Sequence, residues 1–273
     1  MPEEPADDRE AVLARLDLTT PHSARVWNYF LGGKDNYAPD RDLGEQILQH
    51  FPEIVDAARA DRAFLGRAVH HLVGEAGIRQ FLDLGTGLPT ADNTHEVAQR
   101  MAPEARIVYV DNDPLVLVHA QALLTSSPEG VTDYIDGDVH EPGPILEGAG
   151  RTLDFDKPVA LMLLGIMQFV NDDEEAYEIV DRLVAALPSG SYLALAHPTA
   201  EVHTEAMTAA VASWNEQGSS PMKLRSREQL VRFFRGLDLL DPGVVSCSRW
   251  RADRPDIGEI VDVTQFCGVG RKP

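Results

Sequence analysis

A glycine-rich turn and three aspartates have the residue types and spacing of a nucleotide-binding site. The segment FLDLGTGLPTAD (81–92) joins an apolar run to the turn Gly85–Gly87, where backbone N–H groups can approach a ligand closely. Asp83 lies two residues before the turn, Asp111 ends the apolar run IVYVD 24 residues after it, and Asp138 follows a third run, VTDYID. If these runs are parallel strands, the three acids meet at the edge of the sheet where ligands bind.

The elements that must position these acids alternate between strand and helix from residue 79 onward. Apolar runs predict strands at 79–84, 105–111, 131–136, 158–164 and 191–197, and helical periodicity appears at 91–101, 114–124, 173–187, 201–218 and 226–237. Two last strands, at 244–250 and 259–270, are joined by eight residues, too few for a helical crossover, and are expected as an antiparallel hairpin. The pattern predicts a doubly wound α/β fold with a seven-stranded, mostly parallel sheet.

The first 77 residues follow a different pattern. Helical periodicity appears at 8–18, 23–33, 40–51 and 54–77, and no strand-like run interrupts it. We therefore expect two units, an N-terminal helical cap or lid at 1–77 and a ligand-binding domain at 78–273.

Composition excludes several classes of partner. The net charge of −20, from 24 Lys and Arg against 44 Asp and Glu, repels phosphate backbones, so nucleic acid is not expected as a partner. No window reaches the roughly 18 apolar residues of a membrane span, and the acidic N-terminus is no secretory signal, which predicts a cytoplasmic protein without membrane contact. Cys247 and Cys267 have neither CxxC spacing nor nearby histidines, so no metal site is expected. The oligomeric state stays open.

The three aspartates suit the adenosine of a cofactor. Asp111 can accept hydrogen bonds from both ribose hydroxyls, Asp138 can accept from the adenine amine, and Asp83 would lie near the amino-acid end of S-adenosylmethionine. NAD is the rival cofactor, but its GxGxxG turn is not met because Thr90 takes the last glycine position. Asp83–Gly87 resembles the methyltransferase loop instead, in which Pro89 takes the place of the usual third glycine; proline stiffens the turn and removes an N–H.

The sequence resembles known methyltransferases in two places. Residues 78–198, with the hDhGxG pattern of Asp83–Gly87 and the turn Leu187–Ser191, are similar to class I S-adenosylmethionine methyltransferases. The segment HSARVWNYFLGGKDNYAPDRDLGEQI (22–47) is similar to the signature of a bacterial family of S-adenosyl methyltransferases long filed as a domain of unknown function. The resemblance covers nearly the whole chain and implies the fold and S-adenosylmethionine as cofactor, but no particular methyl acceptor.

In class I methyltransferases, helices before the first strand commonly cover the active site. We therefore expect Tyr29–Tyr37 to line the pocket, with an aromatic ring facing the sulfonium and Lys34 pairing with a carboxylate. Gly165–Phe169 would flank the methyl group, and His197, with His140 as the alternative, is the candidate general base. The predicted catalytic residues are His197, Gln168 and Tyr37, and the predicted cofactor-binding residues are Asp83, Gly85, Thr86, Gly87, Asp111, Asn112, Asp138, Val139, Gly165, Tyr29, Gly33, Lys34 and Asn36.

Together these observations predict an S-adenosylmethionine-dependent methyltransferase that acts on an oxygen, nitrogen or carbon nucleophile of a small molecule. A regulatory protein that binds S-adenosylmethionine without turnover is the first alternative, because no residue is an unmistakable base and Pro89 alters the loop. A NAD-dependent oxidoreductase is the second, disfavoured by the same loop.

Overall fold

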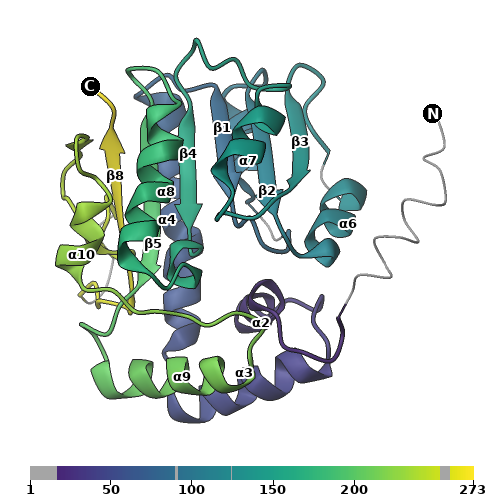
Figure 1. Ribbon diagram of the computed structural model, residues 1–273, viewed down its shortest axis with the longest axis vertical. Helices are drawn as coiled ribbons and strands as arrows, with labels where there is room; N and C mark the ends of the chain where they lie inside the picture. Colours follow the sequence, from purple (N-terminus) through teal and green to yellow (C-terminus); the bar gives the residue numbers. More distant parts are fainter. Residues whose placement is uncertain (1–16, 90–91, 124, 253–258) are drawn as a thin grey trace.

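Five parallel strands form the centre of the sheet, and their carboxyl ends share one edge (Figure 1). The computed structural model describes residues 17–89, 92–123, 125–252 and 259–273. Within these ranges the sheet has eight strands in the order β3-β2-β1-β4-β5-β8-β6, and β7 pairs with β8 off this path. The strands are β1 Gln80–Leu84, β2 Arg106–Asp111, β3 Val131–Asp136, β4 Ala160–Leu164, β5 Tyr192–Pro198, β6 Asp238–Leu239, β7 Val245–Ser246 and β8 Gln265–Arg271. The predicted doubly wound α/β fold is confirmed.

The C-terminal strands differ from the expectation in number. The strand expected at 244–250 is reduced to β7 at Val245–Ser246, and a further short strand, β6, lies before it at Asp238–Leu239. Pro242 and Gly243, which has a φ of +83°, separate them, and the chain turns again at 247–250. Both strands still pair antiparallel with β8, so the sheet has the predicted antiparallel closure with eight strands instead of seven.

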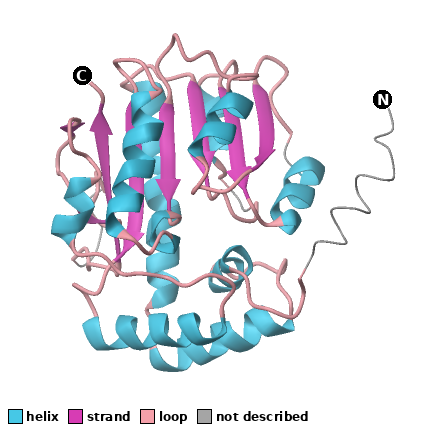
Figure 2. Ribbon diagram, viewed as in Figure 1, coloured by secondary structure: helices cyan, strands magenta, loops and turns pink. Residues whose placement is uncertain are grey.

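Helices cover both faces of the sheet because side chains of the central strands alternate between two apolar clusters (Figure 2). Leu82 and Leu84 of β1 pack with α7, α8 and α10 on one face, whereas Phe81 packs with α4 and α5 on the other. Helix α7 begins with the sequence PGP and was not expected. Proline is tolerated there because the first turn of a helix needs no N–H donor. The helices named here, with α6, are α4 Ile54–Gly74, α5 Thr94–Met101, α6 Pro114–Leu123, α7 Pro142–Ala149, α8 Asp173–Ala185 and α10 Arg227–Arg232.

Three further helices form a cap across the carboxyl edge of the sheet (Figure 1). They are α2 Ser23–Phe30, α3 Ala38–His50 and α9 Thr204–Gln217. All three contribute to one apolar cluster, and the first turns of α4 join it while the later turns of α4 cover the sheet. The cap therefore combines N-terminal helices with α9, which follows β5, and the domain boundary predicted at residue 77 stays a proposal. Most of the predicted helix at 8–18 lies outside the described residues.

None of the described helices is both long and apolar enough to cross a membrane.

Candidate functional site

A cavity lies between the carboxyl ends of the central strands and the cap. Its sheet side consists of the turn 85–88 after β1, residues 111–112 after β2 and residues 165–166 after β4. Side chains of α2 and α9, among them Trp27 and Trp214, form the opposite side. The cavity thus runs along the sheet edge at which the aspartates were predicted to meet.

The turn after β1 brings main-chain atoms to the wall of this cavity. Gly85 and Gly87 have φ angles of +71° and +66°, which glycine adopts without strain. A Cβ atom on Gly85 would lie 2.7 Å from Cβ of Ile166, so a side chain there would collide with the loop after β4. The N–H of Gly87 donates to Oδ2 of Asp111 at 2.8 Å, which fixes the turn against the end of β2.

Asp111 holds a second main-chain donor as well. Its Oδ1 accepts the N–H of Asp113 at 2.9 Å, and the residue is 8 % exposed. Burial raises the pKa of Asp111 above its usual value even though both hydrogen bonds oppose this shift. Each carboxylate oxygen has a lone pair left, so Asp111 can still accept two hydroxyl donors from a ligand in the cavity.

Two other carboxylates are buried in the cavity wall, Asp83 at the end of β1 and Asp61 on α4. Oδ2 of Asp83 accepts a hydrogen bond from Oγ1 of Thr94 at 2.7 Å. Burial is the main reason why the pKa of each acid is raised to about 6, and each of the two is opposed by the positive charge of Arg62. This end of the cavity therefore favours a positively charged group.

Asp61 was missed by the sequence analysis, although the sequence carried a signal. The residue lies on the apolar stripe of the predicted helix 54–77, between Ala58 and Phe64 and one turn before Leu65. Burying a carboxylate among the core positions of an amphipathic helix costs stability, and such a costly position is expected at a functional site.

The end of β4 supplies the remaining polar wall. Gly165 has a φ of +76°, and its carbonyl oxygen accepts a hydrogen bond from Nε2 of Gln168 at 2.6 Å. Gln168 belongs to a short 3-10 helix, η1 Met167–Phe169, and is 7 % exposed. Its Oε1 has no hydrogen-bond partner among the described residues.

The structure brings eight predicted residues to the cavity wall. They are Asp83, Gly85, Thr86, Gly87, Asp111, Asn112, Gly165 and Gln168. Their contacts with a cofactor or an acceptor stay predictions.

Asp138 and Val139 lie outside the described wall, and their contacts with a cofactor stay predictions. Oδ1 of Asp138 accepts the main-chain N–H of His140 at 2.9 Å and lies 2.7 Å from ring Nδ1 of His140, and both side chains are exposed. The carboxylate is held by this local contact after β3. His140, the alternative base, is likewise turned to the surface, while Val139 is buried in the apolar cluster below α7 and α8.

The candidate base His197 has a partner within the protein on each of its two ring nitrogens. It is fully buried and outside the cavity wall, with Nδ1 2.8 Å from the carbonyl oxygen of Pro198 and Nε2 3.0 Å from Nη1 of Arg225. Nε2 must accept from Arg225, so the neutral ring donates through Nδ1. Burial, with the nearby Arg225 charge, lowers the pKa of His197 to about 3. The alternation of side chains along β5 directs this ring to the face covered by α10, where it stacks on Phe233.

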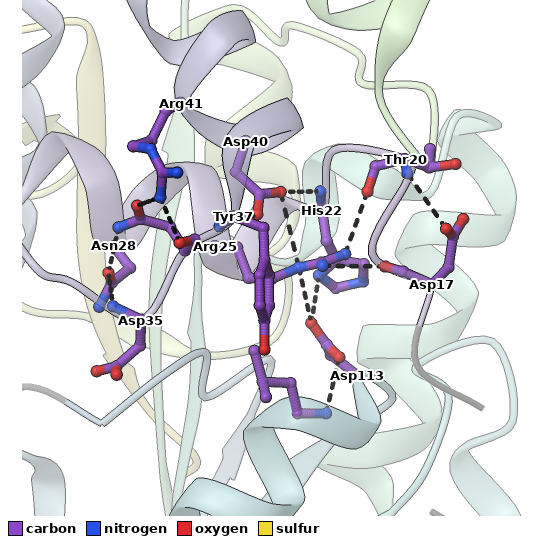
Figure 3. Close-up of polar contacts among 12 residues, drawn as sticks. Asp17, Thr20, His22, Arg25, Asn28, Asp35, Tyr37, Asp40, Arg41 and Asp113 are labelled. Carbon is purple, nitrogen blue, oxygen red and sulfur yellow. Dashed lines mark hydrogen bonds and ion pairs between the residues drawn. The ribbon is translucent and has the colours of Figure 1, made fainter. Parts of the chain in front are cut away.

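The polar residues of segment 22–47 bind one another inside the cap. Oδ1 of Asn28 accepts two hydrogen bonds, one from Nδ2 of Asn36 at 2.9 Å and one from the main-chain N–H of Asp35 at 3.1 Å. A Cβ atom on Gly33 would overlap the Asn28 side chain, so the glycine permits this close approach. Arg41 donates to the carbonyl oxygen of Asn36 at 2.7 Å (Figure 3).

The aromatic residues of the same segment also face cap or loop atoms. Tyr29 packs on Gly44 of α3, where a Cβ atom would lie 2.5 Å from its ring, and Tyr37 packs with Leu88 in a small apolar cluster. Lys34 is exposed. Trp27 and Asn28 line the cavity in their place. Of the predicted segment Tyr29–Tyr37, the described cavity wall includes Phe30 and Leu31, whereas Tyr29, Gly33, Lys34, Asn36 and Tyr37 lie outside it, and the roles of these five stay predictions.

A buried ionic network ties the cap to the sheet (Figure 3). Oδ1 of the fully buried Asp40 accepts the N–H of His22 at 2.9 Å. Nε of Arg25 lies 3.7 Å from Asp40 and 3.7 Å from Asp113, and Nδ1 of His22 lies 3.0 Å from Asp113. Because Asp113 also donates its N–H to Asp111, the network reaches the loop at the cavity.

Comparison with known proteins identifies the family. The family model described as S-adenosyl methyltransferase matches residues 9–273. The chain belongs to this family. A DUF574 family protein from Streptomyces avermitilis is 44% identical to the methyltransferase and has a TM-score of 0.91. The match covers 95% of this chain and 100% of the Streptomyces chain. A candidate methyltransferase from Thermobifida fusca is 38% identical, with a TM-score of 0.85 over 94% of this chain and 96% of its own.

More distant structures show the fold alone. A SAM-dependent methyltransferase from Anabaena variabilis is 13% identical, with a TM-score of 0.50 over 94% of this chain and 99% of its own. No curated protein is significantly similar to the methyltransferase. The predicted family and the predicted cofactor, S-adenosylmethionine, are confirmed by the family match.

The residues of the cavity fit this cofactor. The positive charge of the cofactor suits the buried carboxylate Asp83, which otherwise lies in the wall with a raised pKa. The ribose hydroxyls suit Asp111, whose oxygens can accept two more hydrogen bonds. The main chain at Gly87 is open, since a Cβ atom there would have Cβ of Ala24 as its nearest neighbour at 4.0 Å, and this leaves space for the ligand.

Asp111→Ala is expected to weaken S-adenosylmethionine binding by about 1.5–3 kcal/mol, or roughly 10- to 150-fold. The change removes the acceptor for the ribose and releases the N–H of Gly87. Titration calorimetry measures the effect. Asp136→Ala is the matched control, because Asp136 is the register partner of Asp111 on β3, is exposed and is outside the cavity wall. Equal affinity of the two folded variants would remove Asp111 from the site.

Asp61→Asn is expected to stabilise the ligand-free protein at pH 7.5 and not at pH 4. Burial raises the folded pKa of this carboxyl to about 6 from 3.8, so its cost to stability is absent below pH 3.8, grows as the pH rises and is complete above pH 6. Two pKa units correspond to about 3 kcal/mol at the higher pH. Urea unfolding at both pH values tests this, with Asp56→Asn on the exposed face of α4 as control. The same gain at both pH values would contradict the burial argument.

Proposed function

We propose that this methyltransferase transfers the methyl group of S-adenosylmethionine to an oxygen, nitrogen or carbon atom of a small molecule. The observation that carries the proposal is that the same cavity is lined by the turn after β1, by Gly165 and by side chains of α2 and α9. Space beneath a helical cap suits a small acceptor. The net charge of −20 disfavours nucleic acid as the acceptor.

S-adenosylmethionine, when bound, supplies a methyl group on a positively charged sulfur. The protein contributes position, charge and shelter from water. The turn 85–88 and Asp111 would hold the adenosine, and Asp83 would hold the amino-acid end. The cap excludes water, and alignment of the two reactants alone can supply much of the acceleration. His197 and His140 both lie outside the wall, so neither acts as the base in this proposal.

Release of S-adenosylhomocysteine in the presence of a panel of small phenols, amines and carbon acids tests the proposal. Release that depends on the added molecule is the expected result. Tight binding of S-adenosylmethionine without release for any compound would favour a regulatory protein that binds the cofactor without turnover. Calorimetry with NAD provides the control for the oxidoreductase alternative.

The location of the protein belongs to the same proposal. Cys247 and Cys267 are buried and free in the structure, which suits the reducing conditions of the bacterial cytoplasm.

A further inference from the structure

The cavity beyond Gly165 has an apolar part, here called the chamber. Its walls come from α2, η1, α9 and the chain after α9, and consist of Trp27, Phe30, Phe169, Met207, Trp214 and Met222. Trp27, Phe169 and Met222 are only partly buried by the protein itself, so a ligand can cover more of their surface.

The aromatic rings of the chamber present faces rather than polar atoms. Nε1 of Trp214 already donates to the carbonyl oxygen of Ser220 at 2.7 Å, and the centroid of its ring lies 6.3 Å from that of Phe169. Such walls favour a flat apolar or aromatic body, and the flexible methionines can adapt to its outline.

Three polar side chains meet where the chamber approaches the sheet, and we call them the polar corner: Asp61, Gln168 and Gln265. Nε2 of Gln265 donates to Oδ1 of Asp61 at a long 3.5 Å. A Cβ atom on Gly165 would lie 3.7 Å from Nε2 of Gln168 and 3.9 Å from Nε2 of Gln265, so these groups surround the end of β4.

The polar corner contains hydrogen-bond acceptor atoms that the described residues leave without a donor or with only a weak one. Oε1 of Gln168 is buried without a partner among the described residues, and the second described donor to Asp61 is Sγ of Cys247 at 4.0 Å. With its pKa raised to about 6 by burial, Asp61 is mostly ionised at neutral pH and accepts hydrogen bonds only. Buried acceptors in this condition gain free energy from a ligand that donates.

We propose that the methyl acceptor is a flat apolar molecule with one hydroxyl or amine, whose body lies in the chamber and whose O–H or N–H donates to Asp61 and Gln168. This inference rests on the proposed methyl transfer and names its substrate class. The group that donates to the polar corner lies beside Gly165, at the end of the chamber nearest to the cofactor turn.

The test uses two probes of nearly equal shape, 2-naphthol and 2-methoxynaphthalene, of which only the first has a donor. Calorimetry is run on the full chain saturated with S-adenosylhomocysteine, so the readout is binding and needs no turnover. We expect 2-naphthol to bind at least about tenfold more tightly than the ether, because a site built for a donor rejects the analogue that lacks it. Equal binding of the two probes, or binding of neither, overturns the inference.

Variants locate the site. Asp61→Leu and Gln168→Leu should each reduce the preference for 2-naphthol to about twofold or less, and Asp56→Leu on the exposed face of α4 should keep it. If either variant fails to fold, the other gives the result. A variant that keeps the full preference for 2-naphthol overturns the proposal. An Asp61→Leu protein that loses S-adenosylhomocysteine instead also overturns it, because the polar corner then belongs to the cofactor site.

Filling the chamber gives an independent measurement. Val211→Trp places a ring in the cavity from α9 and should weaken both probes by about tenfold or more, with S-adenosylhomocysteine binding unchanged. Ala212→Trp, at the next and exposed position of α9, is the matched control and should bind both probes normally. Normal probe binding by Val211→Trp places the probes elsewhere. Probe binding as expected, without methylation of the probes or of any compound in the panel, would keep the chamber and the polar corner as a ligand site and contradict the proposed function alone.

Discussion

Gly87→Val is expected to abolish S-adenosylmethionine binding, with an affinity loss of at least about 100-fold. Gly87 has a φ of +66°, which a β-branched residue adopts only under strain, and its N–H positions Asp111. The two methyl groups would extend into the open space between the turn and Ala24 of α2, where the cofactor is expected to pass.

The control for this variant carries the same strain elsewhere. Gly236 has a φ of +78° with no atom within 4 Å of a Cβ position, and it is outside the cavity wall. Calorimetry with S-adenosylmethionine should show normal binding for Gly236→Val and none for Gly87→Val. Similar affinities would mean that the glycine only forms a turn and that the cofactor lies elsewhere.

The largest effect on stability is expected from Asp40→Ala, at about 3–5 kcal/mol. Asp40 is fully buried and accepts the main-chain N–H groups of His22 and Tyr37 at 2.9 and 2.8 Å. Its removal leaves both donors without a partner and takes away one of the two carboxylates beside Arg25, which is itself only 3 % exposed. The cap should therefore loosen from the sheet edge.

Urea unfolding at pH 7.5 measures this loss. Asp42→Ala, two residues further along α3 and exposed, should unfold at nearly the same urea concentration as the unchanged protein. If Asp40→Ala lowered the free energy of unfolding by less than about 1 kcal/mol, the buried network would contribute no more to stability than an exposed ion pair does.

The sheet and its edge could be predicted from the sequence because the signals are local. Apolar runs mark the strands, and the end of every parallel strand lies at the same edge, so Asp83, Gly87 and Asp111 were placed together without knowledge of the rest. The alternation of strands with helices predicted a mostly parallel sheet with helices on both faces.

The cap could not be predicted in the same way. Periodicity shows that a helix has an apolar face but not which element covers it, so neither the role of α9 in the cap nor the place of Asp61 in the cavity followed from the pattern. The segment Tyr29–Tyr37, within the polar stretch 22–47, was interpreted as a ligand-contact surface. Its side chains satisfy each other because a cap over a sheet edge leaves many donors and acceptors to be paired.

The burial of Asp61 and Asp83 has a consequence for the amount of protein in the cell. Without a ligand, the folded chain keeps two acids out of water at neutral pH, which costs stability. A positively charged ligand offsets that cost, and binding to the folded state alone lowers the unfolded fraction further. Chains open to proteases should thus become more frequent when the methyl donor is scarce, so the abundance of this enzyme follows the supply of its own cofactor.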